Sequence, residues 1–331
     1  MASYGPLLQF ALLSGFVLAV TLTLLIGACE HPLRRALSGK TPSQRARISW
    51  WTLVTPALAG IAYVLMAIAM PSMFEGSARF AAACSAHAGT LLHLCVSHPS
   101  GSGQSAWLWG ALALLVGYAA WLAARAAAGL WRARRTLASL VRLSGRPGHP
   151  ERLRVLDVDR PMALACGIGH GHILLSTLLM RQLNPTQLRV VLAHEQAHIT
   201  NRDVLLRLIA AVLSSIQLPS TRRRLLRDLE LALEQRCDFA AANEVGCRVA
   251  VAETIVAMEK IYRQHAREQA PFTMAFFSDF VPERVEALLS PKHSSVSYLG
   301  LMLGILVLAF CSLSVGWLHS ATESFITMMP R

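Results

Sequence analysis

The sequence predicts a multi-pass α-helical membrane protein with a mostly helical α+β domain between its third and fourth membrane-spanning helices. Hydrophobic residues make up 54% of the 331 residues and charged residues only 15%, a balance that is unusual for a soluble protein of this length. The apolar residues gather in four long stretches, and most of the basic residues lie between the third and the fourth. Hydrophobicity and charge therefore indicate both the spans and the inserted domain.

The four stretches divide the chain into three parts. Residues 1–130 are expected to hold three transmembrane helices, at about 7–28, 50–70 and 106–130, because about 20 apolar residues cross a bilayer as a helix. Residues 131–296 are expected to form the inserted domain, and residues 297–331 a fourth span, from 298 to 318, with a short outer tail. Because no Lys or Arg precedes Arg34, the first stretch lacks the positive start of a cleaved secretory signal.

The charges of the short loops predict the orientation in the membrane. The loop of residues 29–49 carries Arg34, Arg35, Lys40, Arg45 and Arg47 against the single acid Glu30, so it is expected in the cytoplasm. Both termini then lie outside a bacterial inner (cytoplasmic) membrane, and the domain of residues 131–296 is cytoplasmic. This orientation also explains the formal charge of +12, and we find no nucleic-acid-binding motif, so no direct nucleic acid binding is expected.

The outward loop of residues 71–105 contains two cysteines in a compartment that permits disulfides. A bridge between Cys84 and Cys95 is slightly favoured over two unpaired thiols in a partly buried hairpin. Cys166, Cys237 and Cys247 lie on the reducing side and are expected to be free.

The inserted domain is predicted to begin with a small β element and to continue as helices. After a linker at residues 144–150, strands are expected at 153–158, 162–167 and 172–176. Asn184 can cap a helix that has Pro185 at its first position and Gln187 at the capping-box position, and that runs to Thr200. Further helices are expected at 203–216, 221–243 and 249–268. Asp203 can either support a metal ligand or cap the helix that it begins, and the cap is preferred.

The capped helix contains Ala193-His194-Glu195-Gln196-Ala197-His198, an HExxH motif. Its histidines are about one helical turn apart, so both imidazoles can reach one metal ion. Zinc fits, because a catalytic zinc site takes three protein ligands and leaves the fourth position for water. Glu195 lies about 100° around the helix from His194, where it can act as the general base. The motif arises by chance in about one chain in a hundred of this length, so it needs support from its context.

A later helix offers the third ligand. Glu234 and Asp238 are four residues apart and share a face. Glu234 can complete a site for one zinc ion per chain, while Asp238 can accept the ring N–H of a ligating histidine. The alternative is that both are surface acids, but the HExxH motif upstream favours the ligand role.

With these residues in place, the chain resembles the membrane-embedded gluzincins of the BlaR/MecR antirepressor type. The similar segments are 165–167, 172–176, the run 187–192 before the HExxH motif, Asn201-Arg202-Asp203, the Glu-x-x-Cys-Asp pattern of residues 234–238, and 284–289. Together they are far more specific than the HExxH motif alone.

The resemblance implies zinc ligation by His194, His198 and Glu234, with Glu195 as general base. The implied fold is a multi-pass α-helical membrane protein with an HExxH metallopeptidase domain between the third and fourth helices. The implied activity is regulated cleavage of a cytoplasmic protein, commonly a DNA-binding repressor. Too few residues follow position 318 for the C-terminal penicillin-binding sensor domain of the antibiotic-sensing members, so no such sensor is expected.

Two details of the mechanism are left to the structure. Tyr262, His265 and Arg284 are candidates to stabilise the tetrahedral oxyanion, and the sequence does not choose among them. The backbone of a protein substrate is expected to add as a strand beside residues 172–176.

Two other kinds of protein are alternatives to a peptidase. A non-catalytic signalling or scaffold protein could keep zinc for structure, but such a site has no use for the general base Glu195. A metal or small-molecule transporter would carry ionisable residues at the bilayer midplane, and the four predicted spans have almost none.

Overall fold

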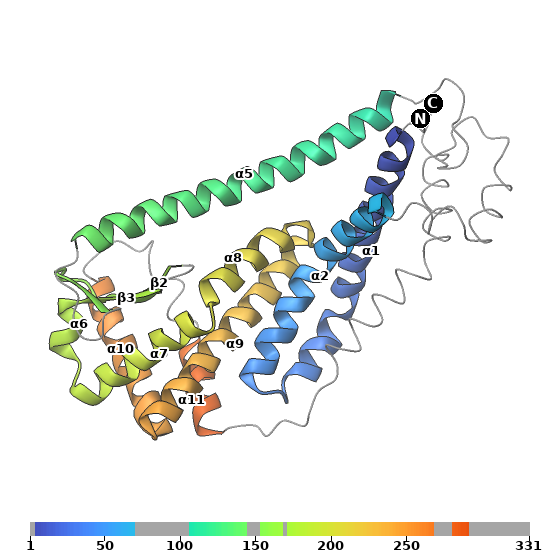
Figure 1. Ribbon diagram of the computed structural model, residues 1–331. Coiled ribbons are helices and arrows are strands. Elements are labelled where there is room, and N and C mark those ends of the chain that lie inside the picture. The colour runs from blue at the N-terminus through green and yellow to red at the C-terminus, as the bar shows by residue number, and fades with distance from the viewer. Residues whose placement is uncertain (1–3, 70–105, 144–152, 168–170, 268–279, 291–331) are drawn as a thin grey trace.

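The computed structural model describes residues 4–69, 106–143, 153–167, 171–267 and 280–290 (Figure 1). Its first three described helices are α1 (Tyr4–Leu37), α2 (Pro42–Ala69) and α5 (Ala106–Leu143). The domain that follows contains β1 (Leu153–Leu156), β2 (Ala163–Cys166), β3 (His172–Ser176), α6 (Thr177–Gln182), α7 (Pro185–Thr200), α8 (Asp203–Leu213), the 3-10 turn η1 (Ser214–Ile216), α9 (Pro219–Val245), α10 (Arg248–Arg267) and α11 (Val281–Leu289). The predicted span at 298–318, the linker at 144–150, and Cys84 with Cys95 lie outside the described residues.

Helices α1 and α2 form an antiparallel hairpin that is apolar enough for a membrane. Among the described residues, Ala11–Leu37 and Pro42–Ala69 have the length and composition of membrane-crossing helices. The two helices approach closely at two glycines, since a Cβ atom at Gly60 would lie 2.8 Å from the carbonyl oxygen of Gly15. Small residues at a helix contact of this kind are typical of membrane helices. Large apolar side chains such as Leu24 and Leu65 remain exposed on the outside of the hairpin.

Helix α5 is longer than the span predicted within it. The prediction ended at residue 130, but the helix continues to Leu143 because no helix-breaking residue interrupts the Arg- and Ala-rich segment that follows. At 1.5 Å per residue its 38 residues extend about 57 Å, well beyond the thickness of the hydrocarbon core. Arg125 stacks over the ring of Trp121, 4.8 Å from its centre.

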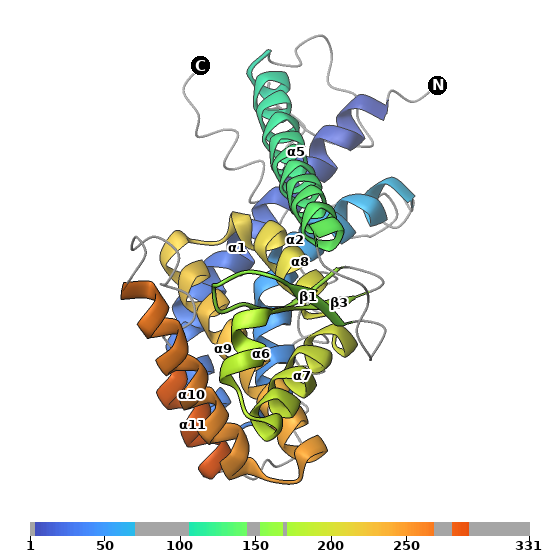
Figure 2. The ribbon, with the colours of Figure 1, turned by 90° about the vertical axis from the view of Figure 1, so that its left-hand side faces the viewer.

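A three-stranded sheet covers one side of α7 (Figure 2). The three predicted strands are present, although β1 and β2 are shorter than expected, and their order is β1-β3-β2. Strand β3 pairs in parallel with β1 and antiparallel with β2. It is therefore the central strand, and the prediction that a substrate adds beside His172–Ser176 is wrong. Both edges of β3 are already paired, whereas β2 has an unpaired edge among the described strands.

Helix α7 is held in place on two faces. Its capping box is present, because the Asn184 and Gln187 side chains each accept a hydrogen bond from the other's backbone N–H. Val191 packs with the sheet residues Ile173 and Leu175. On another face, Val190 packs with α9 and α10 residues, so the HExxH helix lies between the sheet and the later helices.

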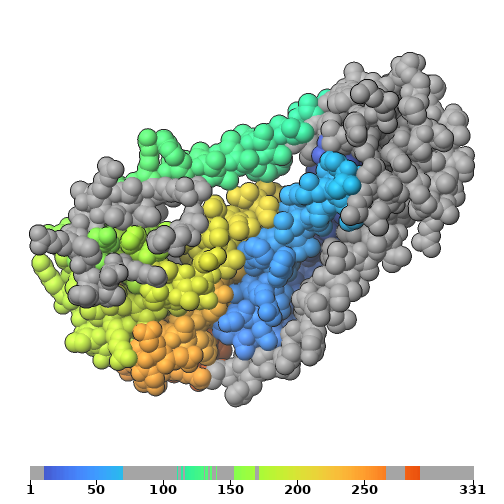
Figure 3. Space-filling view, in the orientation of Figure 1, coloured from blue at the N-terminus to red at the C-terminus, as the bar shows by residue number. Residues whose placement is uncertain are grey.

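Helix α9 joins the domain to the membrane hairpin. Leu225, Leu229 and Leu233 are almost fully buried and form one cluster with Leu53 and Val54 of α2. The same contact appears in Figure 3 as a continuous surface of α2 atoms against those of α8 and α9. The helix ends at Gly246, whose φ of 77° suits a glycine after a helix. The site residues of α9 are thus positioned relative to the hairpin as well as to α7.

Candidate metal centre

Three predicted ligands from two helices converge beside the sheet. His194 and His198 project from α7 and Glu234 from α9, and their candidate ligand atoms all lie within 4.8 Å of one another. The Nε2 atom of His194 lies 3.3 Å from Glu234 Oε2, and Nε2 of His198 lies 3.5 Å from Glu234 Oε1. Two imidazole nitrogens and a carboxylate oxygen suit the three protein positions of a catalytic zinc site.

A buried carboxylate orients the ring of His194. Nδ1 of His194 lies 3.0 Å from Asp238 Oδ1, and only 1% of the Asp238 side chain is exposed. This contact leaves Nε2 to face Glu234. Burial alone would lower the pKa of His194, but hydrogen bonds to Asp238 and Glu234 outweigh it and raise the pKa to about 10. The geometry is the one that an orienting role for Asp238 requires.

Asp203 orients the second histidine, a role that sequence reasoning did not prefer. Its Oδ2 lies 2.7 Å from Nδ1 of His198, and Asp203 is 1% exposed. The cap of α8 is Arg202, in a left-handed conformation and without a side-chain capping hydrogen bond, so the prediction that Asp203 caps the helix is wrong. The left-handed turn places Asp203 against α7. The sequence signal for this contact was the position of Asp203, five residues after His198 within the segment Asn201-Arg202-Asp203.

We expect Asp203→Asn to weaken zinc affinity by about 10- to 100-fold, because residues that hydrogen-bond to metal ligands have effects of this size. Zinc competition with a chromophoric chelator measures the change. Asp159→Asn is the matched control, since Asp159 is exposed in the loop between β1 and β2. Equal zinc affinities for the two variants would show that Asp203 does not support the site.

Three arginines neutralise the carboxylates of the centre. Arg284 donates to both oxygens of Asp238, at 2.8 and 2.6 Å, and its Nη1 lies 3.3 Å from Glu234 Oε2. Arg207 donates to Glu234 Oε1 at 2.8 Å, and Arg236 pairs with Asp203. Although burial raises the pKa of Glu234, its hydrogen bond with His194 and the charge of Arg284 hold that pKa well below its usual range. The carboxylate is therefore ionised, as a metal ligand must be.

The cavity beside the three ligands also contains the predicted general base. Its volume is about 160 Å³, and helices α7 to α11 and strand β2 line it. Glu195 Oε2 accepts a hydrogen bond of 2.6 Å from the backbone N–H of Ala165. Glu195 thus lies between the edge of β2 and the histidines, next to the position that a reacting group would occupy.

The three residues predicted as candidates to stabilise the oxyanion do not all lie at the cavity. Tyr262 lines the cavity and hydrogen-bonds to the backbone of Ala163, and burial raises its pKa to about 12, so its hydroxyl stays protonated. Arg284 also lines the cavity but is engaged by Asp238 and Glu234. His265 is not among the lining residues, and its Nδ1 lies 2.9 Å from the carbonyl oxygen of Ile261. Of the three, the structure brings Tyr262 and Arg284 to the site.

Cys237 lies beside the centre and forms, with His198 and Asp203, a second group of possible ligand atoms within 4.8 Å of one another. Its sulfur is 3.3 Å from Nδ1 of His198, on the side that faces away from Glu234. Burial raises the pKa of Cys237 far above its usual range, and the neighbouring Asp203 raises it further. The thiol is therefore protonated when no metal ion is bound to it. Cys166, Cys237 and Cys247 are all free, as predicted.

Comparison with protein families identifies the segment that contains this centre. Residues 131–267 match Peptidase family M48. The matched segment includes α7 and α9, and therefore all three predicted ligands and Glu195. It indicates a metalloprotease, in agreement with the enzyme class predicted from the HExxH motif.

Several curated proteins are similar to part of the chain, and each is described as a "Protease HtpX homolog". The protein from Pelotomaculum thermopropionicum is 45% identical over 73 residues, which are 21% of this chain and 26% of that protein. The Acidiphilium cryptum protein is 37% identical over 83 residues, covering 24% and 29%. The Aquifex aeolicus protein is 37% identical over 75 residues, covering 22% and 25%.

These matches cover between a quarter and three tenths of the length of the relatives. No solved structure matches the chain significantly. The comparisons therefore support an M48-type, HtpX-like metalloprotease domain, while the narrower resemblance to the BlaR/MecR antirepressor type stays a prediction.

Proposed function

We propose that this protein is a membrane-bound zinc metalloendopeptidase. The observation that carries the proposal is the convergence of His194, His198 and Glu234 on a cavity that also holds Glu195. The M48 match and the apolar hairpin of α1 and α2 support the same conclusion. A zinc ion held by these three ligands would have a fourth position for water, as catalytic zinc sites do.

The chain's own residues supply proton transfer and positioning. A zinc ion held by the three ligands would polarise the scissile carbonyl and make a water molecule more acidic. Glu195 accepts one proton from the attacking water, whose oxygen forms the new bond to the carbonyl carbon. Glu195 then delivers that proton to the leaving nitrogen as the C–N bond breaks. Tyr262, protonated and lining the cavity, is the donor that we assign to the developing oxyanion.

The unpaired edge of β2 is the proposed binding site for the substrate backbone. Met162 exchanges hydrogen bonds with Ser176 on the β3 side, through Ser176 N–H to Met162 O and Met162 N–H to Ser176 Oγ. Because backbone groups alternate in direction along an antiparallel strand, the N–H groups of Ala163 and Ala165 point to the opposite side. The bond from Ala165 to Glu195 agrees with this direction. An extended substrate can pair with β2 beside Glu195 if it takes over the N–H groups of Ala163 and Ala165 from Tyr262 and Glu195.

Ala163→Pro is expected to lower cleavage about two- to tenfold, because it removes the outward N–H that Tyr262 contacts and that a substrate would use, while it leaves the bonds to β3 in place. Ala163→Val is the control, since it adds similar bulk and keeps the N–H. Rates of peptide cleavage and zinc content are measured for both variants. If the two variants cleave equally fast with full zinc, the substrate does not pair with this edge.

The proposed substrate is a cytoplasmic or membrane-proximal protein. The loop charges that put residues 29–49 in the cytoplasm put the metal centre on the same side, because α9 packs along the cytoplasmic half of α2. The narrower proposal, regulated cleavage of a DNA-binding repressor, rests on the resemblance of residues 234–238 to the antirepressor pattern. Both the broader and the narrower proposal assume that the protein lies in a bacterial inner membrane.

The proposed activity is tested with the full chain in detergent micelles and an unfolded protein as substrate. Cleavage should stop when a chelator removes zinc and return when stoichiometric zinc is added. Bound zinc with no cleavage of several unfolded or membrane-proximal substrates would favour the alternative, a zinc-containing signalling or scaffold protein. The edge strand and the placed general base support the enzyme, because a structural zinc site uses neither.

A further inference from the structure

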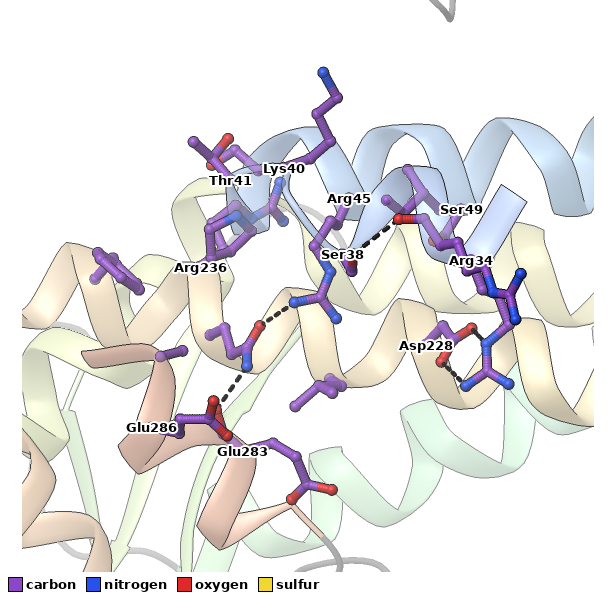
Figure 4. Close-up of a pocket in the computed structure, with 18 of the residues that line it drawn as sticks. Arg34, Ser38, Lys40, Thr41, Arg45, Ser49, Asp228, Arg236, Glu283 and Glu286 are labelled. Carbon is purple, nitrogen blue, oxygen red and sulfur yellow. Dashed lines mark hydrogen bonds and ion pairs between the residues drawn. The ribbon is translucent and has the colours of Figure 1, made fainter. Parts of the chain in front are cut away.

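A second, larger cavity lies at the turn between α1 and α2. Its volume is about 610 Å³, and it is enclosed by that turn, the middle of α9 and one face of α11 (Figure 4). It is separate from the metal centre, because none of the proposed zinc ligands lines it. The charged side chains of its wall are Arg34, Arg35, Lys40, Arg45, Arg236, Asp228, Glu283 and Glu286.

Two of the basic residues are already neutralised by carboxylates. Arg34 forms an ion pair of 2.8 Å with Asp228, and Arg236 pairs with Asp203 at the metal centre. The other charged residues of the wall lie on two sides of the cavity, on the α1–α2 hairpin and on α11.

The remaining positive charges lie on the α1–α2 side. Arg45 donates to the neutral side-chain oxygen of Gln235 at 2.9 Å, and Gln235 in turn donates to the Glu283 carbonyl at 2.8 Å. Gln235 is 3% exposed, so this link fixes the position of Arg45. Among the described residues, no carboxylate forms an ion pair with Arg35, Lys40 or Arg45.

The remaining negative charges lie on α11, across the cavity. The side chains of Glu283 and Glu286 form no ion pair with a described residue, and Figure 4 shows them on the α11 side, with the Lys40 side chain at the far end of the cavity and directed away from them. Opposite charges that face each other without closing into ion pairs leave a bipolar space. A ligand with an anionic and a cationic group, held a short distance apart, complements both walls.

We propose that this cavity binds the phosphoethanolamine headgroup of a membrane phospholipid. The phosphate accepts charge-assisted hydrogen bonds from Arg35, Lys40 and Arg45, and the ammonium donates its three N–H bonds to Glu283 and Glu286. The proposal rests on the proposed membrane orientation, which places residues 29–49 beside the cytoplasmic headgroups. It does not depend on proteolytic activity.

The charges distinguish this headgroup from the other common ones. Phosphatidylglycerol has the phosphate but no cation for Glu283 and Glu286, and it brings a net negative charge near them. Phosphatidylcholine has a cation, but its methylated nitrogen has no N–H to donate. Phosphatidylethanolamine is therefore expected to be retained about tenfold more strongly than either, because only its ammonium can donate charge-assisted hydrogen bonds to the two glutamates.

Native mass spectrometry of the full chain tests the proposal, using micelles that contain equal amounts of the three lipids. Glu283→Gln with Glu286→Gln should abolish the preference for phosphatidylethanolamine over phosphatidylglycerol, because only the anion-binding wall remains. Arg35→Gln with Lys40→Gln should lower retention of both lipids about tenfold. Arg47→Gln is the control, because Arg47 is exposed on the same loop but does not line the cavity.

Each outcome decides the proposal. Retention of all three lipids alike by the unmodified protein would overturn it, as would the same loss in Arg47→Gln as in the double arginine and lysine variant. Added glycerophosphoethanolamine identifies the source of the headgroup. If this soluble ester binds at the same concentration as the lipid, the ligand of the cavity is a free phosphate ester and not a membrane lipid. Zinc content, measured on the same samples, shows that the fold is intact.

Discussion

Glu195→Gln is expected to slow peptide-bond cleavage by about 10²- to 10⁴-fold, the range that a positioned general base contributes, while zinc content stays at one ion per chain. The substitution keeps the size of the side chain and can retain a hydrogen bond with the N–H of Ala165, but the amide cannot accept the proton of the attacking water. Initial rates on a fluorogenic peptide, with zinc measured on the same samples, give both quantities.

The control for this variant is Glu253→Gln, an exposed acid on α10. It should leave the rate unchanged. If Glu195→Gln cleaves as fast as the unmodified protein, Glu195 is not the base, and the enzymatic proposal fails. If Glu195→Gln also loses zinc, the residue has a structural role that the contacts described above do not include. Comparing the proteins cut in cells that carry each form would then identify the natural substrate.

Arg284→Met is expected to destabilise the domain by about 3–5 kcal/mol, the effect of removing one partner from a buried ion pair. Arg284 contacts two carboxylates at once, those of Asp238 and Glu234, and Asp238 is 1% exposed. Without the guanidinium, buried Asp238 loses its arginine partner, and Glu234 retains only one arginine, Arg207. Thermal unfolding in micelles, followed in zinc-free protein, measures the loss.

Saturating zinc should reduce the effect of Arg284→Met, because a bound dication supplies positive charge beside Glu234 and stabilises the folded state by mass action. The control is Arg263→Met. Arg263 forms an i,i+4 pair with Glu259 on α10, but its side chain is 68% exposed, and exposed pairs contribute about 0–1 kcal/mol. Equal melting temperatures for the two variants would show that Arg284 does not neutralise the buried carboxylates.

The parts of the site that lie on single helices could be predicted from the sequence. The capping box at Asn184 specified where α7 begins, and the spacing of His194 and His198 specified that they share a face. The same reasoning placed Glu234 and Asp238 on one face of a later helix. These inferences work because the geometry of a helix relates residues three and four apart without reference to the rest of the fold.

Other assignments depended on contacts between elements and were incomplete or wrong. Asp203 could reasonably be expected to cap α8, but the left-handed turn at Arg202 directs the Asp203 side chain to His198. Residues 172–176 were correctly predicted as a strand, but strand order is not encoded in any local pattern, so the wrong edge was assigned to the substrate. His265 could be separated from Tyr262 only by the position of α10 against the cavity.

By itself, the sequence determined the apolar hairpin, the helix with its HExxH motif and the chemistry of a zinc-dependent peptidase, since all of these follow from hydrophobicity and helical spacing. The tertiary structure decided which carboxylate orients each histidine, which strand edge faces Glu195, and how α9 joins the metal centre to α2. The physical reason is that a side chain's direction on its own helix is a local property. Its partner on another helix depends on how the buried faces of all the elements pack together.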